Sequence, residues 1–467
     1  FDNVPSLQRL MDKRMVTSFG LVLLMLTAGC LGNVRDEIIT ELPEDWRTKT
    51  SRTISQPHLV QFETCFDMEY DLKASIAEEY RTQLLQAVEE QYYYGWGMFD
   101  DGVVAEAAMD GDVASTNSPQ AKTRTQGEDF SGTNNQEQGV DEADFIKTDG
   151  YYIYALQGST LSIMSVPEYG EIEFTSNSSI EGSPISMMLQ GDRLIVLSSY
   201  SPWSVDKGDV LYEFLRWGGD YSEWRVNTLT KYTTYNISDR SSPEVIQELY
   251  LEGYNVDARE IDGSIRAVTH SWLNIPGLSS WLNMPDAYYD LKWDDPQRKS
   301  YREMIAYETI QANDKVLEGL ELEELVPKIY QRIDGEIIEH DMRSQACNNF
   351  AKPMDGFSRG FTNILSLDLF SPEFDYESDH LLSNHPLVYA SADVLVLTEN
   401  AWDWWWFWGQ DEVDDMTNIH TFDISVPGVT TYTGSGRIDG QILNQFSISE
   451  YEGVLRVATT VGQWNRW

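Results

Sequence analysis

Apolar and polar residues follow three different patterns along the 467-residue chain. From Asp67 to about Gln91, apolar residues recur at every fourth position, a spacing that predicts a helix with one packed face. Residues 100–139 have few apolar residues and are rich in Gly, Asp, Ser, Asn, Thr and Gln, which predicts a linker. From Val140 onward, short runs of β-branched and aromatic residues predict strands. The apolar positions of the helix are Leu72, Ile76, Tyr80, Leu84 and Val88.

A turn that contains Asp or Gly, followed by a short strand, recurs along the β-rich region. The first two copies, residues 149–154 and 191–197, begin about 42 residues apart, which is the length of one four-stranded propeller blade. Later copies are residues 262–268, 392–397 and 452–458. A strand end before a polar turn also recurs, at residues 235–239, 367–372 and 422–427. This paired repetition predicts an all-β fold, a β-propeller of four-stranded blades, over the alternative of a β-sandwich.

The β-rich region contains one helical insertion. Residues 296–328 lack the strand pattern, and Pro296 is placed to begin the helical stretch and Pro327 to end it. The chain ends at Trp467, just after a predicted strand. We therefore expect seven or eight blades in the full protein, with the last ones missing from this sequence.

The N-terminal residues have the pattern of a lipoprotein signal peptide. A short basic stretch, residues 11–15, precedes an apolar stretch, residues 16–26, that is too short to span a membrane. Small residues then lead to Cys30, which a lipid would hold on the outer face of the cytoplasmic membrane. The chain does not begin with Met, and we interpret residues 1–10 as upstream sequence read through into the frame. A plain secretory signal with an incidental cysteine is the alternative.

These patterns divide the chain into five parts. In order, they are read-through residues with the signal peptide (1–30), a polar tether (31–60), an N-terminal helical segment (61–95), a flexible linker (96–139) and the β-propeller (140–467).

Two further cysteines remain if Cys30 carries a lipid. Export exposes thiols to oxidation, so we expect a disulfide between Cys65 and Cys347. The alternative is two unrelated buried thiols. The absence of a nearby histidine pattern excludes a zinc site of the usual spacing.

The chain is strongly acidic, with 76 Asp and Glu against 33 Lys and Arg and a formal net charge of −43. Such a surface repels phosphate backbones and disfavours nucleic-acid binding. Solubility in a salty medium explains the charge, and specific cation binding is the alternative. We predict no cofactor, with calcium as the one candidate metal. Its candidate ligands are Asp141, Glu142, Asp144 and Asp149, which can equally cap turns.

One tract is unusually rich in tryptophan. Exposed tryptophans stack on sugars, enter membrane interfaces or anchor protein partners, so the tract is a candidate binding loop. A packed hairpin between blades is the alternative. The residues are Trp402, Trp404, Trp405, Trp406 and Trp408.

No catalytic motif stands out. The six histidines, at positions 58, 270, 340, 380, 385 and 420, include no i,i+4 pair for a metal, although a Ser–His–Asp triad assembles only in space. No G-x-S-x-G elbow, P-loop or dinucleotide fingerprint occurs. Asn177 and Asn236 begin N-glycosylation sequons, which export would make usable.

Three segments resemble a known family. Residues 138–150 resemble the opening signature of the secreted β-propeller domain family, distantly related to WD40 repeats, and residues 443–460 and 252–259 resemble two further signatures. The resemblance covers roughly residues 60–467. It implies an exported protein of several more blades, and it implies no activity because none is established for the family.

These observations lead to three functional hypotheses. The leading one is a cell-surface binding or scaffold protein whose partner is a protein or glycan and whose lipid holds it at the membrane. The sequence leaves enzymatic activity open and does not favour it. The second is an extracellular hydrolase, lyase or cofactor-dependent dehydrogenase with its site in the propeller's central cavity. The third is a calcium-stiffened structural component of the envelope.

Overall fold

The computed structural model describes most of the chain between Leu42 and Val461. The described residues are 42–48, 57–89, 141–142, 144–168, 170–218, 223–261, 264–340, 342, 347–354, 360–370, 375–383, 386–400, 416–426 and 428–461. The predicted lipid site at Cys30, the linker at 96–139 and the tryptophan tract at 402–408 lie outside these residues, so they stay predictions.

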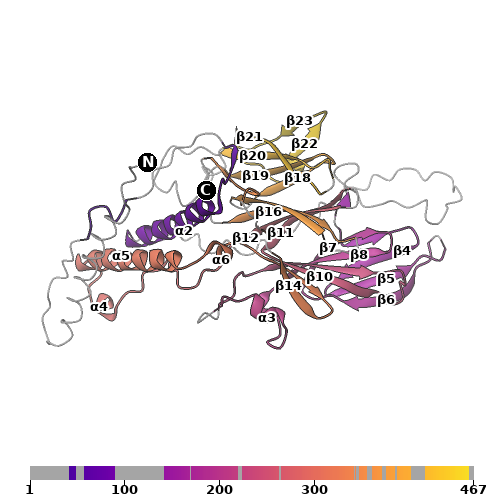
Figure 1. Cartoon of the computed structure of the whole chain (residues 1–467), viewed down its shortest axis with the longest axis horizontal. Helices are drawn as coiled ribbons and strands as arrows, with labels where there is room; N and C mark the ends of the chain where they lie inside the picture. The colour runs from indigo at the N-terminus through magenta and orange to yellow at the C-terminus, as the bar shows by residue number, and fades with distance from the viewer. Residues whose placement is uncertain are drawn as a thin grey trace, which may run out of the picture.

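The described strands form five sheets (Figure 1). The first blade consists of β3 (Ile146–Thr148), β4 (Tyr152–Gln157), β5 (Thr160–Ser165) and β6 (Glu173–Ser179). The second blade consists of β7 (Ser183–Gln190), β8 (Arg193–Tyr200), β9 (Leu229–Asn236) and β10 (Glu244–Glu252), extended by β13 (Ile329–Ile333) and β14 (Glu336–His340).

The remaining sheets follow in chain order. The third blade has β11 (Tyr254–Ile261), β12 (Ser264–Ser271), β16 (Phe361–Asp368) and β17 (Asp375–Leu382) at its centre, with β2 (Asp141–Glu142), β15 (Phe350–Pro353) and β1 (Leu59–Gln61) at its edges. The fourth blade consists of β18 (Leu387–Ala390), β19 (Val394–Asn400), β20 (Met416–Asp423) and β21 (Thr431–Asp439). A C-terminal hairpin consists of β22 (Ile448–Tyr451) and β23 (Val454–Val457).

Apolar layers hold each sheet against the next. Because side chains alternate between the two faces of a strand, a sheet that is apolar on both faces can pack between two others. On β12, Ala267 packs toward the second blade and Val268 packs toward the fourth. Similar layers join the first blade to the second and the fourth blade to the C-terminal hairpin. The stack has the architecture of a β-propeller, which confirms the predicted fold class; the blade number of the full protein stays a prediction.

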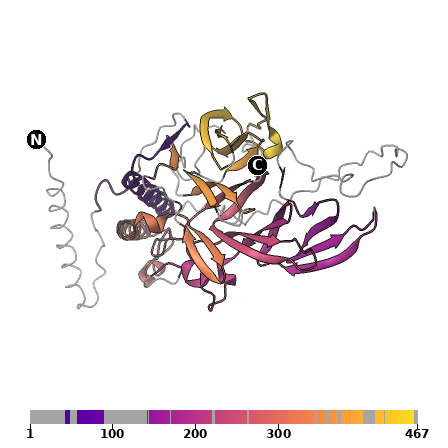
Figure 2. The same cartoon turned by 45° about the vertical axis from the view of Figure 1, so that its right-hand side comes forward.

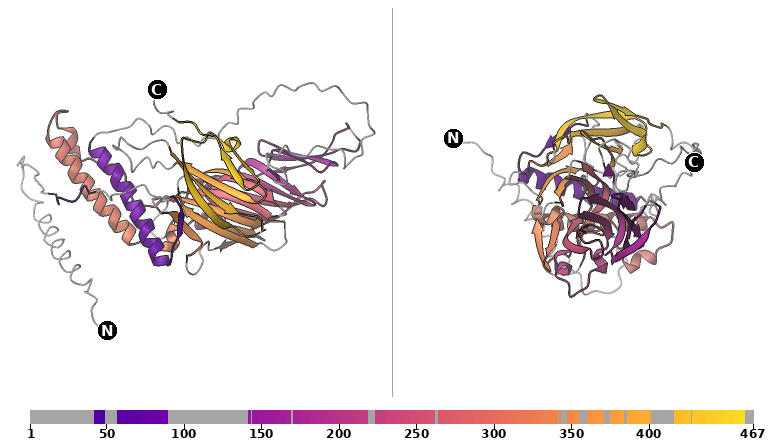
Figure 3. Two further views of the ribbon diagram at one scale, coloured as in Figure 1. Left: turned by 90° about the horizontal axis from the view of Figure 1, so that it is seen from above. Right: turned by 90° about the vertical axis from the view of Figure 1, so that its right-hand side faces the viewer.

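Two long helices form an arm beside the blades (Figures 2 and 3). They are α2 (Cys65–Val88), whose N-cap Thr64 accepts a hydrogen bond from the backbone N–H of Asp67, and α5 (Gln297–Glu318), whose N-cap is Pro296. Short helices complete the structure: η1 (Pro202–Ser204), α3 (Leu211–Phe214), α4 (Asp286–Tyr289), α6 (Leu322–Leu325) and η2 (Gln445–Ser447). Within the described part of the chain, no helix combines the length and apolar character needed to cross a membrane.

The arm is attached to the blades at its base. The expected disulfide between Cys65 and Cys347 is present, with 5.1 Å between the Cα atoms, and joins the start of α2 to the segment before β15. Nearby, the fully buried Glu252 accepts hydrogen bonds from Arg225 Nε (2.7 Å) and Tyr330 Oη (3.0 Å). Arg225 also donates a hydrogen bond to the carbonyl of Val326. The Arg225–Glu252 ion pair is thus connected to the segment that leads from the arm into β13.

Candidate functional site between two blades

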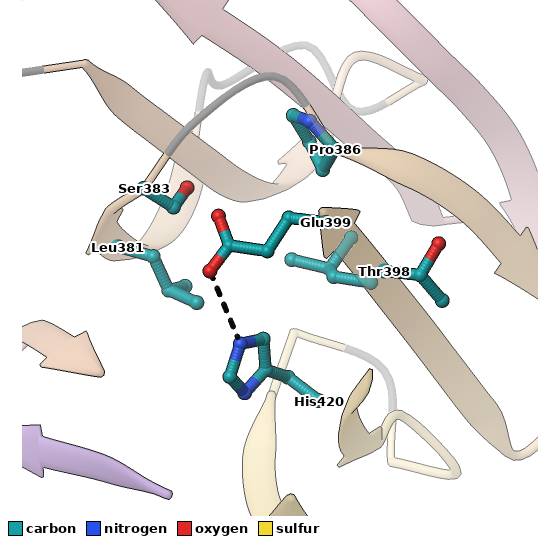
Figure 4. Close-up of a pocket in the computed structure, with 7 residues that line it drawn as sticks. Leu381, Ser383, Pro386, Thr398, Glu399 and His420 are labelled. Atoms are coloured by element: carbon teal, nitrogen blue, oxygen red, sulfur yellow. Dashed lines mark ion pairs between the residues drawn. The ribbon is translucent and has the colours of Figure 1, made fainter. Parts of the chain in front are cut away.

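A small pocket lies where the third and fourth blades meet (Figure 4). Its volume is about 10 Å³, which is the space of a single water molecule. The lining residues are Leu381, Ser383, Pro386, Leu397, Thr398, Glu399 and His420.

The pocket arises because the apolar layer between these blades ends there. Ile364 of β16 packs in that layer, and two positions earlier Thr362 faces the same way, opposite His270 of β12. On the fourth blade, Leu397 packs in the layer and Glu399 follows two positions later on β19. The strand alternation therefore brings polar side chains from both blades to one level of the interface.

Hydrogen bonds and one longer ion-pair contact connect the polar side chains on each side of the pocket. On the third blade, His270 Nδ1 lies 2.9 Å from Thr362 Oγ1, which lies 2.7 Å from Ser383 Oγ. On the fourth blade, His420 Nε2 lies 3.6 Å from Glu399 Oε1, and His420 Nδ1 lies 2.7 Å from Ser435 Oγ. The hydrogen bonds satisfy Nδ1 of each histidine, whereas the buried Nε2 atoms of His270 and His420 make no hydrogen bond to the described residues.

Ser435, His420 and Glu399 are the three residue types of a hydrolytic triad. The histidine is only 1% exposed and the glutamate 8%, and the pocket beside them has room for one water molecule. A hydrolase needs space for its substrate next to the nucleophile. All three side chains belong to the fourth blade, and the pocket beside His420 is too small for a substrate, so the geometry suits a buried polar contact within that blade better than catalysis.

A second buried histidine lies on the opposite side of β16. His380 Nδ1 is 2.8 Å from Asn363 Oδ1, and its Nε2 is 3.1 Å from the carbonyl oxygen of Met342. Burial lowers the pKa of His380 to about 3, so the imidazole is neutral over the ordinary pH range. Its neighbour Asp379 has the opposite shift, because burial and the charge of Glu377 raise the pKa of that carboxyl to about 6.

The second blade carries another group of titratable side chains. Lys231, 1% exposed, forms ion pairs with Glu181 and Glu248 and lies over the ring of Tyr250. Burial, followed by the charges of Glu248 and Glu181, raises the pKa of Tyr250. Burial also acts to raise the pKa of Glu181, but the Lys231 ammonium outweighs it and holds that pKa below its usual value. Two acids thus neutralise the buried lysine. A buried charge needs such partners, because burying it alone would be strongly destabilising.

The predicted calcium ligands do not form a cluster in the described residues. Asp149 Oδ1 accepts hydrogen bonds from the backbone N–H groups of Tyr151 (2.9 Å) and Tyr152 (2.7 Å), which is the turn-capping role considered as the alternative. Asp144 Oδ1 accepts from the N–H of Phe145. The backbone of Asp141 and Glu142 pairs with β11, and their side chains lie outside the description. No group of three or more His, Cys, Asp or Glu side chains that could hold a metal occurs within the described ranges.

The two glycosylation sequons differ in accessibility. Asn177 is exposed on β6. Asn236 is half-buried at the end of β9, where its Oδ1 accepts a hydrogen bond from the N–H of Ser238. Asn177 is therefore the more accessible of the two amides.

The pocket residues were not identified from sequence. Spacing along the sequence excludes an i,i+4 metal pair but cannot show which side chains meet in space. His420 and Glu399 lie on neighbouring strands of the fourth blade and line one pocket with Leu381 from the third. A usable signal was present: His270, His380 and His420 each interrupt a run of strand-forming residues. A histidine buried in a strand needs hydrogen-bond partners, and the next sheet can supply them.

The sheets, stacked face to face through apolar layers, have the architecture of a β-propeller. The model of the β-propeller domain family matches residues 130–467, so the chain belongs to this family. An uncharacterised protein of Methanocaldococcus jannaschii is 25% identical over 390 residues, which cover 75% of this chain and 53% of that relative. An uncharacterised protein of Archaeoglobus fulgidus is 22% identical over 375 residues, covering 72% of this chain and 53% of the relative. The chain therefore spans about half the length of the curated relatives it matches.

Solved structures show weaker likeness. An apocarotenoid oxygenase mutant of Synechocystis aligns with a TM-score of 0.22 and 11% identity, over 66% of this chain and 62% of that chain. A similarity at this level carries no argument about activity.

The opposite shifts of Asp379 and His380 predict a specific pH dependence. The neutral form of Asp379 stabilises the fold below about pH 4, and this contribution is lost as pH rises through about 6. Neutral His380 stabilises the fold above about pH 6.5, and its contribution is lost as pH falls toward 3. The two effects oppose each other between about pH 4 and 6.

Asp379→Asn should therefore raise the free energy of unfolding at pH 8 by about 1–2 kcal/mol, allowing for solvent screening at this half-buried site. Its stability should fall more steeply than that of wild type between pH 6 and 4, as measured by urea unfolding. The matched control is Asp375→Asn, an exposed acid on the same strand. Parallel curves for wild type and both variants would contradict the assignment.

Proposed function

We propose that this chain is an exported, cell-surface scaffold that binds a protein partner and is held to the outer membrane face by a lipid on Cys30. The observation that carries the binding role is an apolar sheet face on the first blade. Ile146 is 58% exposed and Phe174 is 68% exposed, at opposite edges of the same sheet. The signal-peptide pattern at residues 11–30 supports export and the lipid.

The exposed face continues across the sheet. The strand register pairs Ile146 with Ala155, Ile153 with Met164, and Met164 with Phe174, so these apolar side chains share one side. The polar side chains of Ser162 and Asn177 lie on the same side. The other side of the same sheet packs on the second blade through Tyr154, Leu161 and Ile163. A sheet with two apolar faces is built to be covered on both, as the second and third blades are. Aliphatic side chains favour a protein surface over a glycan as the partner.

The buried polar groups favour a non-catalytic role. The pocket at His420 has room for a water molecule, and Lys231 is neutralised within its own sheet. The side chains that could take part in catalysis thus form contacts within the blades. The large apolar side chains on the outer face of the first blade remain exposed, where a partner can bind them.

The experiment combines location and binding in the full chain expressed in a cell that processes lipoproteins. We expect the wild-type chain to carry a lipid by mass spectrometry, to be digested by protease on intact cells, and to crosslink to a protein partner. Cys30→Ser should release the chain from the membrane. The double variant Ile146→Asp, Phe174→Asp should remain folded and anchored but lose at least about tenfold of the crosslinked product, because charge enters the apolar face.

The matched control is Val245→Asp, which changes a 52% exposed apolar residue on the second blade. Equal loss of the crosslinked product in the control would contradict the assignment of the face. An unlipidated chain that stays inside the cell would contradict the proposed location.

An extracellular hydrolase is the alternative, favoured by the 2.7 Å contact between Ser435 Oγ and His420 Nδ1. Because the site is closed, we expect a fluorophosphonate probe to label the wild-type chain no more than Ser435→Ala. Labelling that disappears in Ser435→Ala and His420→Gln, but persists in Ser449→Ala, would replace the scaffold proposal with a hydrolase at the blade interface.

A further inference from the structure

Large aromatic side chains are exposed along the end of the helical arm that lies away from the blades. Trp293 is 77% exposed, Tyr289 is 67% exposed and Trp281 is 61% exposed. Tyr289 ends α4, and Figure 1 shows α4 at the end of the arm farthest from the sheets. We call this region the arm tip: α4, the segments on either side of it, the end of α2, the start of α5 and residues 42–48.

The arm tip is a packed structure. Val88 of α2 packs against Ala306 of α5 in a small apolar core that Leu282 also contacts. Arg302 donates from Nε to the carbonyl of Val88 (2.7 Å) and from Nη1 to Tyr288 Oη (3.2 Å), which ties α2, α4 and α5 together. The aromatic side chains are therefore presented on a fixed base, and their exposure does not come from a loose helix end.

The N-terminal segment docks on the same end of the arm. The ring of Trp46 packs edge-on against Tyr307, with 6.4 Å between centroids. Arg47 forms ion pairs with Glu89 at 2.8 Å and with Glu303. Cys30 precedes Leu42 by 12 positions, and a chain of that length spans at most about 40 Å. A lipid on Cys30 would thus hold the arm tip near the membrane.

A membrane surface suits these exposed side chains. Trp and Tyr are enriched at the membrane–water interface, where an apolar ring and a polar atom are both accommodated. Acidic residues such as Asp290 and Asp294 lie among the basic ones at the tip, so the attraction comes from the rings more than from charge. A second contact that buries apolar area at the interface strengthens the attachment of a lipid-anchored chain.

We propose that the arm tip is this second contact: Trp281, Tyr289 and Trp293 lie in the headgroup layer of the membrane that holds the lipid. The inference rests on the proposed lipid anchor. It places the arm between the membrane and the blades and leaves the apolar face of the first blade open to a partner.

The test locates the tip in a lipid-anchored full chain. Trp293→Cys is labelled with an environment-sensitive fluorophore, and the chain is reconstituted into phosphatidylcholine vesicles that contain a nitroxide lipid. The matched control is Val245→Cys, 52% exposed at the start of β10, whose other end adjoins the base of the arm. We expect at least about twofold more quenching by the nitroxide at position 293 than at 245, and less quenching by aqueous iodide. Equal quenching at both positions overturns the proposal.

A second measurement separates the tip from the lipid. Two variants are compared with wild type: Trp293→Ser alone, and Trp293→Ser combined with Trp281→Ser and Tyr289→Ser. Both should transfer between vesicles several-fold faster than wild type, and their melting temperatures should match that of wild type. Unchanged transfer with the lipid present overturns the arm-tip proposal alone. A chain without lipid on Cys30, seen by mass spectrometry, overturns the anchor on which it rests. Vesicles with added phosphatidylglycerol should give the same ratio, and a strong dependence on this anionic lipid would contradict attraction through the rings.

Discussion

Burial of the central strands on both faces is the constraint on which this structure depends. All eight residues of β12 and the first seven of β16 are buried, because the third blade is packed between the second and the fourth. A strand in that position must be apolar over most of its length on both sides. Where it is not, a polar side chain is costly to bury unless another protein group forms a hydrogen bond with it, because water cannot reach it. His270 and Asn363 illustrate the rule on opposite sides of the same sheet.

Because of this constraint, the buried polar side chains contribute to stability and are not available to a ligand. His420, Glu399, His380 and Lys231 have the chemical character of active-site groups, yet their partners lie within or between blades. Our proposals instead use apolar side chains that are exposed. Among the described residues, such side chains lie on the outer face of the first blade and at the tip of the arm, among other places. They lie on different parts of the molecule, so one surface can contact a membrane while the other binds a partner.

The fold could be predicted from sequence further than the site could. Repeated turn-and-strand units near residues 149 and 191 predict blades because each strand is a local pattern. The helix Cys65–Val88 lies close to the limits that its periodicity indicated. The Cys65–Cys347 pairing followed from having only two candidates. The pocket at His420 could not be predicted, because its members come from different strands of two blades and meet only when those blades stack. The same holds for residues 42–48, whose place on the arm depends on contacts with α5.

Hydrogen–deuterium exchange by strand tests the central constraint most directly. If two-faced burial of the third blade holds the structure together, amide protons of β12 and β16 should exchange at least about 100-fold more slowly than those of β6, which is an edge strand of the first blade. The second blade should be protected almost as strongly. Exchange of β12 and β16 as fast as that of β6 would contradict the account, because the stacked apolar layers would then not be the most stable part of the protein.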